Sequence, residues 1–142
     1  MTRVTPNRIT SLKENEIFVF GSNEGGEHNI GSAKTAYEYW GAVYGEGKGL
    51  RGRTYAIPTK KKRKYKGNRA SLTISQIKEN VMKFIDFTKK NPELTFMVTK
   101  IGCGRAQFSV EEISVLFKEA VSLSNIYLPI EFWEHLKKNN HI

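Results

Sequence analysis

Three short stretches place small or polar residues directly after apolar runs, an arrangement suited to anion binding. The first is SNEGGEHNIGSA, residues 22–33; the second ends in Lys60 after YAIPT; the third is GCGRAQF, residues 102–108. Glycines let main-chain N–H groups approach phosphate oxygens, which a Cβ atom would obstruct. The stretches therefore predict a backbone-lined site for a phosphate-bearing ligand.

The candidate phosphate ligands are the small residues of two of these stretches and their neighbours. They are Gly25, Gly26, Gly31 and Ser32 in the first stretch, and Gly102, Cys103, Gly104, Arg105, Ala106, Gln107 and Phe108 in the third. The third stretch is the stronger signal because it links a buried strand to a helix start, where backbone N–H groups and the helix dipole favour an anion. For the first stretch, an ordinary flexible loop is the alternative.

Four side chains in these stretches have two interpretations each. Asn23 suits a hydrogen bond to a sugar hydroxyl, although asparagine after a strand is equally often a turn former. Phe108 suits stacking on a sugar or base, but an aromatic residue at a helix start more often belongs to the core. Lys60 would neutralise phosphate or attack a sugar carbon as a Schiff-base nucleophile, unless it only begins a basic run. Cys103 has no histidine at a motif position to activate it, which favours a space-filling role.

Length and charge indicate one globular domain over residues 1–142, with 1–15 as an N-terminal lead-in and 60–70 as a basic loop. The net charge of +9 favours an anionic partner, and nine of the 23 lysines and arginines lie between Arg51 and Arg69. That run is either a solvated loop or a phosphate-contacting surface. A non-enzymatic nucleic-acid-binding module that uses residues 60–69 is therefore one hypothesis, and it predicts binding that falls steeply with salt.

Composition also argues against several classes of protein. No apolar run approaches the roughly 18 residues of a membrane span, and the start MTRVTPNRIT is too polar for the core of a signal peptide. We therefore expect a cytoplasmic protein without a membrane partner, located in the host cytoplasm if the protein is viral. Cys103 is the single cysteine, and with only His28, His135 and His141 beside it there is no zinc-site spacing. We expect no metal and no cofactor.

Strand and helix patterns alternate along the chain. Apolar runs predict strands at 16–23, 53–60 and 94–101, and helical spacing predicts helices at 32–40, 72–90 and 109–122. The stretch 125–133, NIYLPIEFW, predicts a last short strand and a terminal helical stub. Thr73 or Ser71 would cap the second helix, and Ser109 with Glu112 has the spacing of a capping box. The glycine-rich stretch 41–53 predicts a loop.

This alternation predicts an α/β sandwich with a mixed, mostly parallel sheet. In such sheets ligands bind at the carboxyl ends of the strands, and each of the three candidate stretches follows a predicted strand. We therefore expect the three stretches to share one edge of the sheet.

Together the three stretches resemble the macrodomain family. SNEGGEHNIGSA is similar to that family's asparagine and glycine-rich loop, and IGCGRAQF is similar to its second phosphate loop. A macrodomain-like family common in phages and bacteria is more similar still, through IFVFGSN, GxGxGLxGxxYAIPTK, TxIGCGxAxFxxEEI and LP.EF. This resemblance covers residues 16–132 and implies a macrodomain-like three-layer α/β/α sandwich.

The resemblance implies binding of ADP-ribose or a related NAD-derived nucleotide. Asn23 would bind ribose, while the glycine-rich loops would hold the phosphates and the distal ribose. In a phage or prophage, a binder of this kind would sequester or degrade an NAD-derived immune signal, a counter-defence role that rests on family analogy.

The branch of macrodomains that removes terminal ADP-ribose from proteins is also similar, and it implies an enzyme. Its ITKK segment carries a lysine that attacks the ribose, and Lys60 in IPTKKKR falls on that position. The branch has an acid where this chain has Ala106. An ADP-ribosyl glycohydrolase, acting on a protein, nucleic acid or small signal, would therefore need an acid from elsewhere, such as Glu24 or Glu27.

Three further positions depart from the family pattern. Gln107 and Asn29 stand where the family has glycine, and the family's usual aspartate near the amino terminus has no counterpart before residue 16. We expect Gln107 to take a glycine-like backbone conformation, which would distort the turn or place an amide in the phosphate site.

Overall fold

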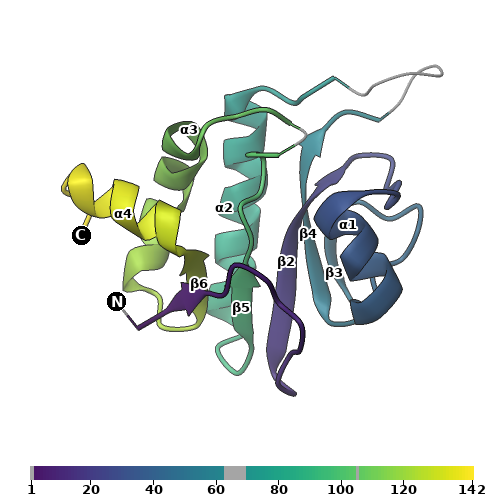
Figure 1. The fold of residues 1–142 in the computed structure, drawn as a ribbon, viewed down its shortest axis with the longest axis horizontal. Helices are drawn as coiled ribbons and strands as arrows, with labels where there is room; N and C mark the ends of the chain where they lie inside the picture. Colours follow the sequence, from purple (N-terminus) through teal and green to yellow (C-terminus); the bar gives the residue numbers. More distant parts are fainter. Residues whose placement is uncertain (1, 63–69, 105) are drawn as a thin grey trace.

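The computed structural model describes residues 2–62, 70–104 and 106–142 (Figure 1). Its elements, in chain order, are β1 (Val4–Thr5), β2 (Glu16–Asn23), α1 (Gly31–Thr35), η1 (Ala36–Trp40), β3 (Gly49–Arg51), β4 (Thr54–Lys60), α2 (Ile74–Lys90), β5 (Thr95–Val98), α3 (Val110–Ser114), η2 (Val115–Ser122), β6 (Ile126–Pro129) and α4 (Ile130–Lys138). The strands form a single sheet in the order β1-β6-β5-β2-β4-β3. Neighbouring strands are parallel except for the antiparallel β3–β4 pair, which confirms the predicted α/β class with a mixed, mostly parallel sheet.

Helical segments pack on both faces of the sheet, and Figure 1 shows β2 and β4 between α2 and α1. On one face, fully buried Ile57, Phe84 and Phe117 belong to a large core made by the central strands with α2, η2 and α4. On the other face, Ala33 and Ala36 pack with β2 and β4 in a smaller core. The small alanine side chains bring α1 and η1 close to the sheet, next to the loop that follows β2.

Helix α2 follows the sequence prediction closely. Its buried residues are Ile77, Val81, Phe84, Ile85 and Thr88, which recur at helical spacing. Thr73 forms a capping box with Gln76, because each side chain bonds the backbone N–H of the other residue. The helix ends at Lys90, just before the Asn91-Pro92 pair. The helix packs on one face of the sheet, where the Phe84 ring contacts Tyr55 of β4 and Phe96 of β5.

The structure differs from the sequence predictions in four places. The predicted loop 41–53 contains β3, which closes on β4 through Gly52 at φ +56°. The predicted helix 109–122 changes from α-helix to 3-10 helix after Ser114, although its Ser109–Glu112 capping box is present. The predicted helix 32–40 becomes a π-helix from Ala36. The predicted strand 94–101 ends at Val98, so the residues before the Gly102 turn are irregular.

The N-terminal lead-in contributes β1, which the sequence does not predict. Val4 pairs with Leu128 on the parallel strand β6. The Arg3 guanidinium donates to four carbonyl oxygens near the end of η2 and the start of β6, those of Ala120, Val121, Leu123 and Ile126. Its backbone oxygen accepts from the Trp133 indole at 2.7 Å, and the guanidinium lies 5.1 Å from the centre of that ring. Arg3 therefore fixes the start of the chain to the sheet edge.

We expect Arg3→Met to lower the free energy of unfolding by about 2 kcal/mol, because several carbonyl oxygens lose a charged donor. Urea unfolding followed by tryptophan fluorescence measures this difference. Lys118→Met removes an exposed positive charge from η2 and should change stability by less than about 0.5 kcal/mol. Equal midpoints for the two variants would contradict the anchoring role.

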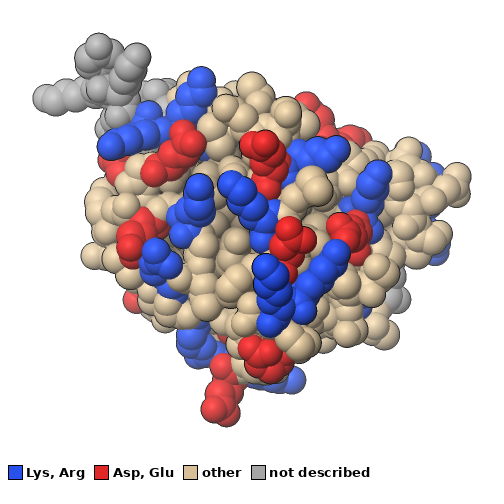
Figure 2. All heavy atoms as spheres, turned by 180° about the vertical axis from the view of Figure 1, so that it is seen from behind, with Lys and Arg blue, Asp and Glu red and all other residues tan. Residues whose placement is uncertain are grey.

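At the two ends of the basic loop, the backbone of residues 59–61 is hydrogen-bonded to that of residues 70–72. Lys61 donates its N–H to Ala70 at 2.8 Å, and Leu72 donates to Thr59 at 2.9 Å. Residues 63–69, most of the run predicted to contact nucleic acid, lie outside the described residues. The face opposite the view of Figure 1 shows basic and acidic side chains interspersed rather than a patch of one sign (Figure 2).

Among the helices that the structure describes, none is both long and apolar enough to cross a membrane. The same residues contain no group of three or more histidine, cysteine, aspartate or glutamate side chains placed to hold a metal ion.

Candidate functional site

The three candidate stretches converge because the strands before them are adjacent and parallel. Asn23, at the end of β2, lies in register with Lys60 at the end of β4, after an irregularity at Ser22. Behind them, a Cβ atom on Gly21 would lie 3.4 Å from the Cβ of Ile101 and 3.5 Å from the nitrogen of Gly102. The loop after β5 therefore lies directly against β2, and the three stretches share one edge of the sheet.

A small cavity of about 190 Å³ opens where these stretches meet. Its wall contains the predicted residues Asn23, Gly31, Ser32, Lys60, Gly102, Gly104 and Ala106, together with Gly21, Glu27, Ile30, Ala33, Thr59, Lys100 and Ile101. Each of the three stretches thus contributes to one hollow at the carboxyl ends of the strands, where α/β proteins bind ligands.

A larger cavity of about 880 Å³ adjoins the small one. The two share Ser32, Lys100 and Gly104, so these three residues mark their junction. Cys103 lies on the wall of the larger cavity, as do residues 5–10 of the N-terminal segment and Tyr39 and Trp40 of η1. The N-terminal residues are absent from the sequence prediction because only the β1–β6 pairing brings them here.

Backbone N–H groups suited to an anion occur around this junction. Among the described residues, the N–H groups of Gly102 and Gly104 donate to no protein acceptor. Helix α1 begins at Gly31, so the N–H groups of its first turn have no acceptor within the helix. A Cβ atom on Gly31 or Gly104 would meet nothing within 4 Å, so these two glycines border open space.

The remaining predicted residues lie away from both cavity walls or outside the described residues. Gly26, at φ +67°, packs against the neighbouring loop, because a Cβ atom there would lie 2.3 Å from the nitrogen of Glu46. Gly25 lies beside Lys62, whose Cγ would be 3.3 Å from such an atom. Phe108 packs against the large core, in agreement with the core interpretation. Arg105 lies outside the described residues.

The Asn23 side chain is hydrogen-bonded to the backbone of its own loop. Its side-chain nitrogen donates to the backbone oxygen of Glu27 at 2.9 Å, and its side-chain oxygen accepts from the Glu27 N–H at 3.0 Å. The residue is 7% exposed. Its amide therefore fixes the turn that carries Glu27 to the wall of the small cavity, which is the turn-former interpretation of the sequence.

Gln107 adopts φ +64°, the glycine-like backbone conformation expected from its place in the turn. It is exposed and lies on neither cavity wall, while its N–H donates to Gly104 at 3.0 Å and closes the turn. The turn therefore accommodates glutamine at this position at the cost of backbone strain, and the residue is on neither cavity wall.

We expect Gln107→Gly to raise the free energy of unfolding by about 0.5–1 kcal/mol, because glycine adopts a positive φ without a Cβ clash. Chemical denaturation measures the change. Gln76→Gly, inside α2, should instead lower stability by about 1 kcal/mol, because there glycine adds backbone entropy and removes the capping box. If Gln107→Gly instead lowers the free energy of unfolding, the positive φ of Gln107 does not strain the backbone.

Cys103 is half-buried on the wall of the larger cavity. Its thiol donates to the backbone oxygen of Ile101 at 3.5 Å. Burial raises the pKa of the Cys103 thiol to about 11, so the group is protonated at neutral pH. A protonated thiol is a poor nucleophile, in accord with a packing role.

The raised pKa predicts that Cys103 reacts slowly with iodoacetamide in the folded protein. Because the thiolate is the reactive form, the rate should rise about tenfold per pH unit and level off only near the pKa of about 11. Mass spectrometry follows the reaction, with Cys103→Ser carrying Ser124→Cys as an exposed control that reacts readily near pH 8.5. Fast labelling of Cys103 at pH 7 would contradict burial of the thiol.

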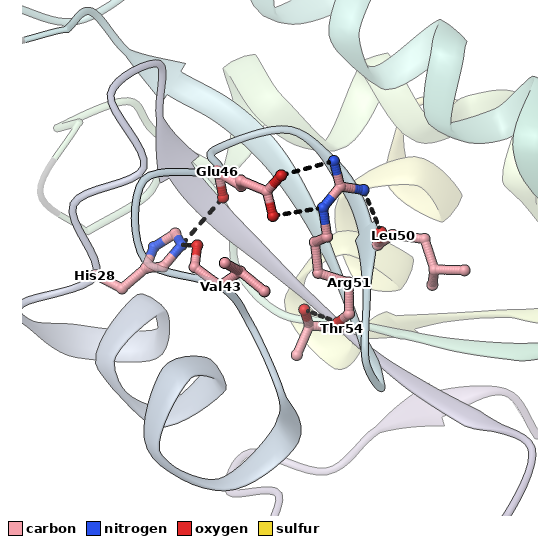
Figure 3. Close-up of polar contacts among 6 residues, drawn as sticks. All are labelled: His28, Val43, Glu46, Leu50, Arg51 and Thr54. Atoms are coloured by element: carbon pink, nitrogen blue, oxygen red, sulfur yellow. Dashed lines mark hydrogen bonds and ion pairs between the residues drawn. The ribbon is translucent and has the colours of Figure 1, made fainter.

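A buried histidine, considered in the sequence only as a metal ligand, joins the loop after β2 to the loop before β3. His28 is 2% exposed, and its Nε2 lies 3.0 Å from the backbone oxygen of Val43 and 3.1 Å from that of Glu46 (Figure 3). Both partners are acceptors, so Nε2 carries the hydrogen. Glu46 also pairs with Arg51 of β3 at 2.7 Å. His28 thereby joins the loop after β2 to the loop before β3, and the Glu46–Arg51 ion pair joins that second loop to the sheet.

Comparison with known proteins shows a fold but no family. No protein family model and no curated protein sequence matches the chain. The fold is similar to that of a solved protein of unknown function from Bacteroides thetaiotaomicron, with a TM-score of 0.59 and 12% sequence identity, over 84% of this chain and 90% of that one. This similarity supports the α/β fold with its mostly parallel sheet and carries no function.

Proposed function

We propose that the protein is macrodomain-like and binds an ADP-ribose-type nucleotide across its two joined cavities. The observation that carries the proposal is the junction, where Ser32, Gly104 and Lys100 border both cavities. In the same turn, the N–H groups of Gly102 and Gly104 have no acceptor within the described part of the chain. Such N–H groups are the usual ligands of a phosphate. A diphosphate at the junction would leave one sugar for each cavity.

The sizes of the cavities suit the two ends of such a ligand. The larger, about 880 Å³, has room for a nucleoside between apolar residues such as Ile9, Phe18 and Val110. The smaller, about 190 Å³, suits a single ribose beside Lys60. Lys100 adds positive charge at the junction, although its ion pair with Glu131, at 3.1 Å, offsets part of it.

Calorimetric titration with ADP-ribose at 50 and 300 mM NaCl tests this proposal. A pocket lined by backbone N–H groups should bind one equivalent at both salt concentrations, with only a modest loss of affinity at high salt. Absence of binding at the lower concentration would overturn the proposal. Binding of a single-stranded oligonucleotide that disappears at the higher salt, without ADP-ribose binding, would instead favour the nucleic-acid-binding module.

A second candidate function, ADP-ribosyl glycohydrolase, is supported by one observation: Lys60 and Glu27 lie on the wall of the same small cavity. Glu24, the other acid considered, is exposed and not on that wall. In the reaction, the neutral Lys60 amine would bond to the ribose C1 while the bond from C1 to the leaving oxygen breaks, and the Glu27 carboxylic acid would protonate that oxygen. Water would then hydrolyse the lysine–sugar bond and release ADP-ribose.

Incubation with a mono-ADP-ribosylated protein tests the enzyme. Release of free ADP-ribose that is lost in both Lys60→Ala and Glu27→Gln, with ADP-ribose still bound by each variant, would support it. Release that persists in Lys60→Ala would overturn the role of this lysine, and no release by the unaltered chain would leave binding as the function.

A further inference from the structure

Lys100 is the charged residue that the two cavities share. Among the described residues, the wall of the larger cavity also contains Arg8 and that of the smaller one also contains Glu27 and Lys60, whereas Lys100 lies on both walls. The diphosphate of the proposed ligand would bind at this junction. Of the cations on the two walls, Lys100 is therefore the one at the position proposed for the phosphates.

The backbone on both sides of Lys100 is fixed, whereas its side chain is long and half exposed. Thr99 donates to the backbone oxygen of Val19 on β2 twice, from its N–H at 3.1 Å and from its hydroxyl at 2.8 Å. Ile101 is buried in the large core. A lysine ammonium has three donors on a flexible four-carbon stem. The ammonium of Lys100 can therefore exchange one partner for another without a movement of the backbone.

The partner of this ammonium in the structure is a carboxylate that lies on neither cavity wall. Lys100 Nζ donates to Glu131 Oε2 at 3.1 Å, and Glu131 is the second residue of α4. The pKa of the Glu131 carboxyl is held below its ordinary value, first by hydrogen bonding to its own backbone N–H and then by Lys100, while burial opposes both. The start of a helix also favours a negative charge. Glu131 therefore keeps its charge when Lys100 leaves it.

A phosphate at the junction and the Glu131 carboxylate are two anions within reach of the same ammonium. The side chains of the ion pair are 49% and 36% exposed, and ion pairs of this kind are weak. A diphosphate can therefore displace the carboxylate, but its affinity falls by the strength of the contact that is broken.

We propose that Glu131 sets the affinity of the nucleotide site by competing with the ligand's phosphates for Lys100. On binding, Lys100 exchanges the Glu131 carboxylate for a phosphate oxygen, and no covalent bond changes. Glu131 is thus a positioning residue that acts through Lys100. This inference rests on the proposed function, because it requires that the diphosphate bind at the junction of the cavities.

Calorimetric titration with ADP-ribose of the full chain, of Glu131→Gln, of Lys100→Met and of the double variant tests the inference. We expect Glu131→Gln to bind about fivefold more tightly than the unaltered chain, because the ammonium is no longer held by a carboxylate. We expect Lys100→Met to bind more weakly. In the Lys100→Met background, Glu131→Gln should change the affinity by less than about twofold, because its effect requires the ammonium.

Glu119→Gln is the matched control. Glu119 of η2 forms an ion pair of the same kind with Lys89 of α2, and neither residue lies on a cavity wall. The substitution removes the same charge and breaks a similar contact, so it should leave the affinity for ADP-ribose within about twofold.

The outcomes separate the inference from the proposed function. If the unaltered chain binds ADP-ribose and Glu131→Gln binds it no more tightly, the competition is overturned and the nucleotide site remains. If Glu131→Gln gains as much affinity in the Lys100→Met background as alone, Glu131 repels the ligand directly, which also overturns the inference. Absence of binding by the unaltered chain and by every variant would overturn the proposed function and the inference together.

Discussion

Replacing His28 with alanine lowers the free energy of unfolding by about 3 kcal/mol, the largest effect that we expect from a single side chain near the site. The substitution leaves a cavity beside Phe20, whose ring centre lies 5.5 Å from the imidazole. It also removes the N–H shared by the backbone oxygens of Val43 and Glu46. Chemical denaturation at neutral pH measures the loss.

Two further variants separate these contributions. His28→Gln keeps a side-chain N–H donor and should recover part of the lost stability, whereas His141→Ala, at an exposed position, should change it by less than about 0.5 kcal/mol. Because His28 fixes the loop that carries Glu27 and Ile30 to the small cavity, His28→Ala should also weaken nucleotide binding. A His28→Ala variant as stable as the unaltered protein would contradict the view that the His28 hydrogen bonds to Val43 and Glu46 hold the two loops together.

The second large effect is on ligand binding. We expect Gly104→Val to weaken ADP-ribose binding at least tenfold, equivalent to about 1.4 kcal/mol or more, while the protein stays folded. Gly104 borders open space at the junction and its φ is not in the left-handed region, so valine fits the protein but blocks approach of a phosphate to the backbone. Calorimetry measures the affinity, and thermal unfolding verifies the fold.

Ser124→Val provides the matched control, because Ser124 is exposed in the turn before β6 and lies on neither cavity wall. It should bind ADP-ribose as the unaltered chain does. If Gly104→Val binds as tightly as this control, the phosphate does not approach the Gly102–Gly104 turn.

The sequence predicts elements whose signal is local. The apolar runs of β2 and β4 and the helical spacing of α2 each lie within one segment, so their residues indicate their own structure. β1 and β3 are only two and three residues long, and each depends on pairing with a partner strand, Val4 with Leu128 and Leu50 with Tyr55. Such short strands have too few residues to show the alternation of apolar and polar residues that predicts a strand.

The candidate site also has features that the sequence predicts and features that depend on contacts between distant residues. The glycine-rich stretches could be predicted to meet, because parallel strands place the following loops at one edge. The role of Asn23 as a brace depends on where its amide finds partners, and the sequence allowed both interpretations. The wall formed by Asn7 and Arg8 depends on the β1–β6 pairing across the whole chain. Contacts of such long range leave no pattern in the residues themselves.

The most direct test of the nucleotide site is a two-dimensional NMR titration of the ¹⁵N-labelled protein with ADP-ribose. We expect saturable shifts of the backbone N–H signals of Gly31, Gly102 and Gly104. Those of Gly41 and Gly52, which pack against each other and lie on neither cavity wall, should move less. Saturable shifts that leave Gly31, Gly102 and Gly104 unmoved, or no shifts at millimolar ligand, would contradict a phosphate site at the junction of the two cavities.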